Sequence, residues 1–185
     1  MSKSASLRPT LWRTCRVLAN HSRLKIIALL ARDPPQTVSS VAIRLELSLS
    51  GASEYLRALE ARSLLSARRI GRRVEYRLNP DAGTNDNLVQ SLRQALRQDT
   101  PATDAVFHAC TAFTHPRRIE IFRSLSARSQ ILEQLQAATR IPPIALFRHL
   151  GKLESRGYVR CADGIFSAVS PKGGVGGALG RLAAR

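Results

Sequence analysis

Four arginines gather within six positions around a single glycine, Gly71; they are Arg68, Arg69, Arg72 and Arg73. Guanidinium groups donate planar, bidentate hydrogen bonds that suit phosphate oxygens. A hairpin gains nothing by packing four like charges together, so these residues are predicted to bind the phosphates or the minor groove of a DNA duplex. The alternative is that they form only a solvated hairpin tip.

A second group of side chains lies upstream and could read base edges. Ser48 can cap a helix whose inner face consists of Ala52, Leu56 and Leu59. The outward positions of this helix are Leu49, Ser50, Ser53, Glu54 and Arg57. Small polar or cationic side chains on an outer face suit the major groove. We therefore predict base contacts by Ser50, Ser53 and Arg57.

Local patterns predict the elements that position these groups. An apolar stripe over 24–30 indicates a helix, and Thr37 can cap a second helix over 38–46. Only three residues link that helix to the one capped by Ser48, which is typical of a helix-turn-helix. From 65 to 78 the apolar period changes to two, which predicts a β-hairpin.

The chain also contains an internal repeat. Cys15 and Cys110 are 95 residues apart, as are Arg23 and Arg118. After one deletion the offset becomes 94, and it then relates further pairs: Leu56 and Leu150, Glu60 and Glu154, Arg62 and Arg156, Leu64 and Tyr158. The same order of elements over so long a stretch indicates a tandem duplication.

This duplication predicts a fold that is mainly α with small β-hairpin wings, built from two tandem winged helix-turn-helix units. The first DNA-binding unit is expected at 1–84. An inter-copy helix over 86–98 and a second, degenerate winged-helix unit are expected within 85–170. Residues 171–185 are rich in glycine and are interpreted as a flexible basic tail.

Three segments carry a family resemblance: NHSRLKIIALL from Asn20, LSLSGASEYLRALEARSLL from Leu47, and RRIGRRVEYRL from Arg68. In this order and spacing they resemble the winged helix-turn-helix of ArsR-type bacterial transcriptional regulators. THPRRIEIFRSL from Thr114 and FRHLGKLESRGYV from Phe147 resemble the same family. The family normally works as a homodimer of single-domain chains. The resemblance therefore implies a monomeric pseudo-dimer here.

The second copy departs from this pattern. Its outward helix positions carry Pro143, Ile144 and Phe147, and its hairpin tip lacks an arginine cluster. Such apolar groups can contact little beyond thymine methyl groups. Arg148 and Lys152 remain candidates for contacts with the DNA backbone. The alternative is a copy that serves as the pseudo-dimer partner or as a protein-contact surface.

The cysteines raise the question of a sensed ligand. The positions of the family's usual metal sites hold no cysteine in 38–46 and no histidine in 86–98. Cys15 and Cys110 occupy equivalent positions and could approach each other as a redox or metal pair. The alternative is that each is a small buried apolar residue. We expect no metal and no cofactor.

Composition limits the remaining classes. The 185 residues carry 29 Lys+Arg against 13 Asp+Glu, a net charge of +16, which favours a polyanionic partner. No apolar run is long enough to span a bilayer, so a soluble, cytoplasmic protein is expected. No catalytic motif is present, which disfavours an enzyme. The alternative to a sequence-specific regulator is an architectural or scaffold protein of the nucleoid, chromosome segregation or replication initiation.

Overall fold

The structure is a computed structural model, which describes residues 10–81, 86–98 and 102–185. The N-terminal half begins with α1 (Leu11–Leu18), α2 (His21–Arg32), β1 (Gln36–Thr37), α3 (Val38–Arg44), α4 (Leu49–Glu60), β2 (Leu65–Ile70) and β3 (Arg73–Leu78), and it ends with α5 (Asp86–Leu96). These elements confirm the predicted helices and hairpin. The short strand β1 was not predicted from the sequence.

The C-terminal half repeats this order of elements. It consists of α6 (Thr103–Ala112), α7 (Pro116–Ala127), β4 (Gln130–Ile131), α8 (Leu132–Thr139), α9 (Pro143–Glu154), β5 (Val159–Ala162), β6 (Ile165–Ala168) and α10 (Gly174–Ala184). Each half holds a small antiparallel sheet, with the strand order β1-β3-β2 in one and β4-β6-β5 in the other. The protein is therefore mainly helical, with two small sheets.

The two hairpins have two-residue turns. Ile70 pairs with Arg73 across the first turn, and Ala162 pairs with Ile165 across the second. Gly71 has a φ of 59°, and Asp163 and Gly164 have φ values of 50° and 76°. Positive φ values in the central positions match the right-handed twist of the strands, which is why glycine and aspartate occur there.

Side-chain caps fix the starts of the helix-turn-helix helices. The Thr37 side-chain oxygen accepts a hydrogen bond from Ser40 N at 3.2 Å, and the Ser48 oxygen accepts one from Gly51 N at 3.0 Å. Each satisfies a backbone N–H that lacks a partner within its helix. Both predicted caps are confirmed. They fix the first residue of α4, and hence which side chains α4 turns outward.

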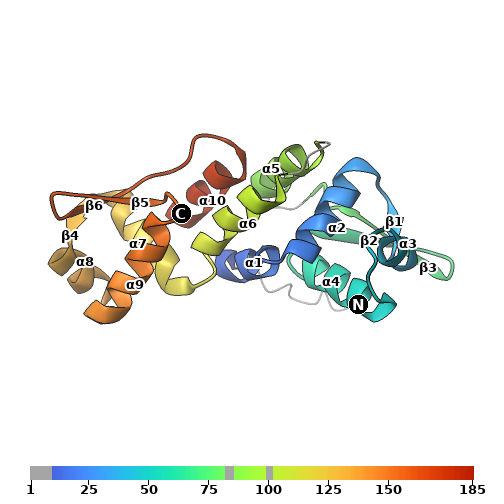
Figure 1. Ribbon diagram of the computed structural model, residues 1–185, viewed down its shortest axis with the longest axis horizontal. Helices are drawn as coiled ribbons and strands as arrows, with labels where there is room; N and C mark the ends of the chain where they lie inside the picture. Colours follow the sequence, from blue (N-terminus) through green and yellow to red (C-terminus); the bar gives the residue numbers. More distant parts are fainter. Residues whose placement is uncertain (1–9, 82–85, 99–101) are drawn as a thin grey trace, which may run out of the picture.

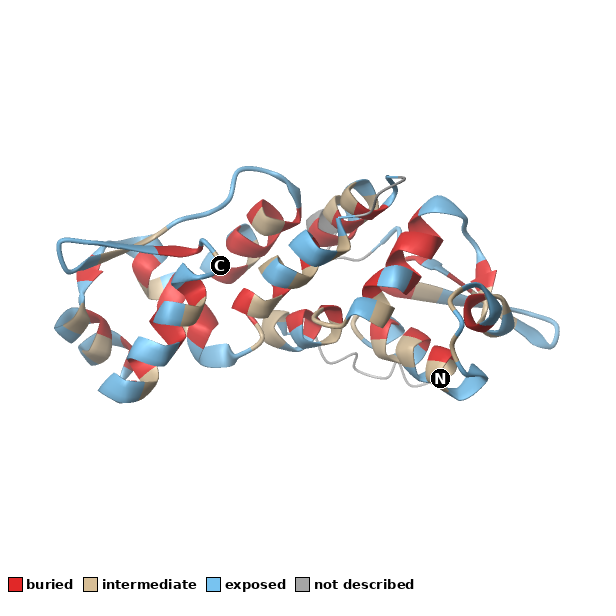
Figure 2. Ribbon diagram, viewed as in Figure 1, coloured by how far each residue is buried: buried red, intermediate tan, exposed pale blue. Residues whose placement is uncertain are grey.

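One hydrophobic core runs through both halves. In the middle of the molecule α1 packs on α6, and α5 packs on α10 (Figure 1). The buried residues follow these central helices and the inner faces of α2 and α7 (Figure 2). The hairpins extend toward opposite ends, and α4 and α9 lie along one long edge. This shared core fixes the positions of the two outer regions relative to each other.

The expected flexible tail at 171–185 is wrong. Residues 174–184 form α10, which packs against α5, α6 and α7 and buries Val175, Ala178, Leu179 and Ala183. A Cβ at Gly177 would lie 2.8 Å from Pro171 O, and one at Gly180 would lie 2.7 Å from Ser170 Oγ. These glycines therefore permit close packing on the preceding segment, whereas a glycine-rich sequence by itself predicts flexibility.

Among the described helices, none combines the length and the apolar character needed to cross a bilayer.

Candidate nucleic-acid interface

The helix-turn-helix of the N-terminal half is formed by α3 and α4. The turn between them passes through Glu46, which has a left-handed φ of 54°. Ala52, Leu56 and Leu59 on the inner face of α4 are fully buried. This packing fixes the rotation of α4 about its axis, so its opposite face is presented to solvent.

The predicted reading residues lie on that opposite face. Leu49, Ser50, Glu54 and Arg57 are exposed, and Ser53 is half-buried. Arg57 donates two hydrogen bonds to Ser53 Oγ, from Nε at 3.2 Å and from Nη2 at 2.7 Å. The serine thus holds the guanidinium group against the helix. Ser53 and Arg57 act as a unit, because removal of the serine hydroxyl also frees the arginine.

The arginine cluster lies at the tip of the β2–β3 hairpin. All four of its side chains are exposed; they are Arg68, Arg69, Arg72 and Arg73. Arg72 and Arg73 also line an open groove of about 650 Å³ between the hairpin and α3, whose other wall includes Ser39, Ser40 and Ile43. A groove with cationic and hydroxyl side chains on its walls is suited to a phosphate backbone.

One further cation near this groove is already paired. The Arg44 guanidinium group donates to Asp33 Oδ2, and this hydrogen bond lowers the pKa of Asp33. The carboxylate thus offsets the positive charge of Arg44. The net positive charge on the walls of this groove therefore comes from Arg72 and Arg73.

The corresponding surface of the C-terminal half differs. Ile144 and Phe147 of α9 are 88% and 55% exposed. The β5–β6 turn consists of Asp163 and Gly164 and carries no arginine. Arg148 is exposed and Lys152 is half-buried, and both line a pocket with residues of α7. The apolar Ile144 and Phe147 of α9 are thus exposed to solvent, whereas the cationic Arg148 and Lys152 line the pocket.

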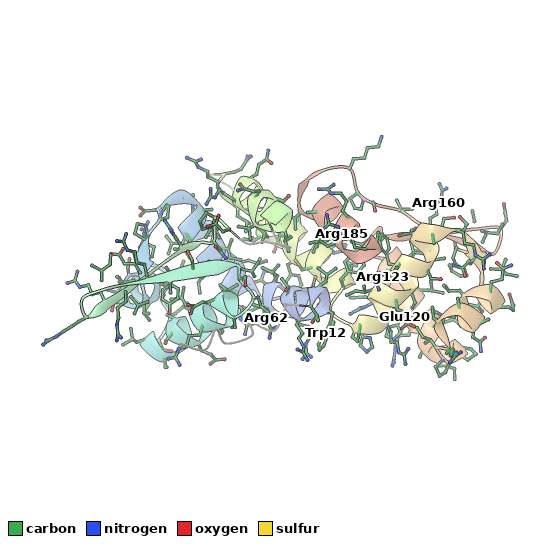
Figure 3. All side chains as sticks on the ribbon, turned by 180° about the vertical axis from the view of Figure 1, so that it is seen from behind. Trp12, Arg62, Glu120, Arg123, Arg160 and Arg185 are labelled. Atoms are coloured by element: carbon green, nitrogen blue, oxygen red, sulfur yellow. The ribbon has the colours of Figure 1, made fainter. Side chains whose placement is uncertain are left out.

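A basic surface that was not predicted from the sequence lies beside α1. The guanidinium groups of Arg13 and Arg16 lie over the Trp12 ring, at 5.1 Å and 5.7 Å from its centroid. Together with Arg23 and Arg62 they line a pocket of about 360 Å³. Trp12 and Arg62 are near one another next to α4 (Figure 3). The sequence signal was Trp12 followed by Arg13 and, three residues later, Arg16, which periodicity alone does not connect to Arg62.

The two equivalent cysteines do meet. Cys15 and Cys110 are fully buried where α1 packs on α6. Burial, followed by the hydrogen bond that Cys15 shares with Cys110, raises the pKa of Cys15 well above its ordinary value. A neutral buried thiol is a poor metal ligand and a poor nucleophile. Within residues 10–81, 86–98 and 102–185 no cluster of three or more side chains of metal-ligand type occurs. This geometry favours the packing role.

Comparisons with known proteins concern part of the chain. No curated protein matches it. Among solved structures, reduced HlyU from Vibrio cholerae N16961 has 29% sequence identity in an alignment that covers 45% of this chain and 84% of that chain, with a TM-score of 0.37. A family model described as winged helix-turn-helix DNA-binding matches residues 20–65. The N-terminal half therefore carries a winged helix-turn-helix DNA-binding domain, and its partner is double-stranded DNA.

Proposed function

We propose that the protein is a sequence-specific, ArsR-like transcriptional regulator that has no catalytic activity. The observation that carries this proposal is the outer face of α4, where Ser53 orients Arg57 beside an exposed arginine wing. Hydroxyl and guanidinium groups distinguish bases in the major groove, while arginines on a hairpin hold the duplex through its phosphates or minor groove. Ser50, Leu49 and Glu54 complete the reading surface.

We further propose that the chain is a tandem duplication that replaces a homodimer. The repeated order of elements and the equal strand order in the two sheets support this interpretation. So does the pairing of equivalent helices, α1 with α6 and α5 with α10. If the two halves of one chain bury the surface that two copies of a homodimer would bury between them, no second copy is needed. Sedimentation at micromolar concentration is expected to give a monomer, and a tight dimer would contradict the proposal.

Selection from a random pool of DNA duplexes tests sequence specificity. The purified full chain is expected to enrich a defined motif, and a duplex with that motif should bind at least ~10³-fold more tightly than a random one at physiological salt. The Ser53→Ala, Arg57→Ala double variant is the matched control, and it should enrich a less informative motif. A selection in which the wild-type chain enriches no motif would contradict the regulator proposal.

The exposed Ile144 and Phe147 favour a second candidate function. An apolar helix face on an otherwise basic protein suits a protein contact. In this candidate the molecule is an architectural or scaffold protein that holds DNA without regard to sequence. Binding that depends on salt but yields no motif in the selection would favour it over the regulator.

A further inference from the structure

A pocket of about 460 Å³ lies between the start of α7 and the second half of α9. Five of its lining side chains are of the basic types; they are His115, Arg118, Arg148, His149 and Lys152. Gly151 and Ser155 complete the lining, and no carboxylate belongs to it. A concave site lined by cations favours an anionic occupant, because cations gathered without a counter-charge repel one another.

Arg118 is the most constrained of these cations. Its residue is only 9% exposed, and its Nη2 donates to Thr114 Oγ1. Its Nε is buried without a hydrogen-bond partner, and no ion pair to Arg118 occurs in the described parts of the chain. A buried guanidinium group without a carboxylate has a high desolvation cost. Because Arg118 also lines the pocket, an anion bound there would offset this cost.

The histidines supply another oriented donor. His115 Nδ1 accepts a hydrogen bond from Arg117 N at 3.1 Å, so the neutral ring carries its proton on Nε2. The ring centroids of His115 and His149 are 4.6 Å apart. Burial lowers the pKa of His149 to about 4, and the charges that add to this effect are those of His115, Arg118, Arg148 and Arg117. An anion in the pocket would oppose each of these contributions.

The equivalent place in the N-terminal half is built differently. The Arg23 guanidinium group lies over the Tyr55 ring, 5.3 Å from its centroid, and its Nη1 donates to Val17 O at 3.3 Å. By the repeat offset of 94, Glu54 and Tyr55 correspond to Arg148 and His149. The C-terminal half therefore has the cation Arg148 where the N-terminal half has the carboxylate Glu54. It also has the imidazole of His149 where the N-terminal half has the Tyr55 ring that lies over Arg23.

We infer that the α7–α9 pocket binds a phosphate group through Arg118, His115 and the cations of α9. A phosphate offers several acceptor oxygens to the donors that converge here. Two sources share this chemistry, the backbone of a DNA duplex and a free phosphate or phosphorylated small molecule. The DNA source rests on the proposed function, since α9 lies along the same edge as α4 (Figure 1). The free source does not rest on it.

The first arm of the test measures affinity for a DNA duplex of random sequence against salt concentration. Arg148→Gln with Lys152→Gln removes two pocket cations from the surface of α9, without disturbing the buried Arg118. If DNA supplies the phosphate, the affinity falls several-fold and the salt slope falls by about 1, because each phosphate contact contributes about 0.9. Arg117→Gln is the matched control, because Arg117 lies on α7 outside the pocket and pairs with Glu120 at 3.0 Å.

The second arm titrates the full chain with inorganic phosphate and follows the imidazole NMR signals. If the pocket takes free phosphate, the signals of His115 and His149 shift saturably and the pKa of His149 rises, while those of His21 and His108 stay in place. The Arg148→Gln, Lys152→Gln variant should weaken this binding at least ~10-fold, and Arg117→Gln should not.

The outcomes separate the two proposals. A response in either arm supports the pocket and identifies the source of the phosphate. If Arg72→Ala with Arg73→Ala weakens DNA binding, but the pocket variant behaves like Arg117→Gln in both arms, the inference is overturned and the proposed function stands. If the wild-type chain binds no DNA, the proposed function fails, and the phosphate titration alone decides the inference.

Discussion

The outer faces of α4 and α9 occupy equivalent places in the two halves, yet they have opposite chemistry. The face of α4 holds an arginine that its neighbouring serine orients, whereas that of α9 exposes Ile144 and Phe147. Behind these faces the inner residues of both helices are buried in one core. The contrast shows that core packing preserves a fold even when its surface changes, because stability depends on the inner face and recognition on the outer one.

The contrast extends to α2 and α7, which pack against α4 and α9. In the N-terminal half Arg23 is covered by the ring of Tyr55, and in the C-terminal half Arg118 faces a pocket of cations. In the C-terminal half, α9 thus presents an apolar patch on one side and lines a basic pocket on another. We propose different duties for the halves, with base reading assigned to the N-terminal one.

The largest effect is expected from the core that the halves share. Leu179→Ala removes a fully buried side chain from α10, which packs against α5, α6 and α7. It should lower the free energy of unfolding by ~2–5 kcal/mol, as measured by urea denaturation. The half-buried Leu182→Ala is the control on the same helix and should cost less. Loss of structure in the C-terminal half alone would show that the core does not couple the halves.

A smaller effect is expected on sequence preference. Ser53→Ala with Arg57→Ala should reduce discrimination by ~1–3 kcal/mol for each direct base contact that is lost, as measured by competition between duplexes. Phe147→Ser, at the matching surface of α9, should leave the preference nearly unchanged. The selected site should be non-palindromic, with one half strongly specified. Two equally informative inverted half-sites bound by a monomer would show that α9 also reads bases.

The wing should act on affinity without regard to sequence. Arg72→Ala with Arg73→Ala should lower the salt slope by about 2, because each phosphate contact contributes about 0.9. Affinity should fall by a similar factor on all duplexes. The exposed Arg128 and Arg160 of the C-terminal half provide a control with the same loss of charge. Equal slopes for the two double variants would remove the wing from the interface.

The smallest effect is expected on the pH dependence of stability. The folded protein lowers the pKa of His149 from 6.5 to about 4, mainly by burial, so between these values the unfolded chain binds more protons. The free energy of unfolding should therefore decrease as the pH falls from about 6.5 toward 4. His149→Gln should flatten this dependence in phosphate-free buffer. The control is Tyr55→Phe at the equivalent position of the N-terminal half, which removes no histidine and should keep the wild-type dependence.

The sequence by itself determined the local elements and most of the polarity of the α4 face. Thr37 and Ser48 cap their helices because a hydroxyl side chain satisfies a free N–H within the same turn, and Gly71 sets the hairpin because its φ is positive. Each of these effects acts over a few residues, so the pattern of residue types contains it. The outward positions of α4 followed for the same reason, since a buried stripe at helical spacing defines its opposite face.

Only the tertiary structure decided the features that depend on distant segments. Residues 174–184 form a helix because α5, α6 and α7 supply an apolar surface for it, whereas a glycine-rich sequence considered alone has a weak helix propensity. The contact of Cys15 with Cys110 requires α1 to lie on α6. The pocket around Arg118 requires α7 to lie against α9, which no local period encodes. Long-range packing, where it supplies more free energy than local propensity, determines such features.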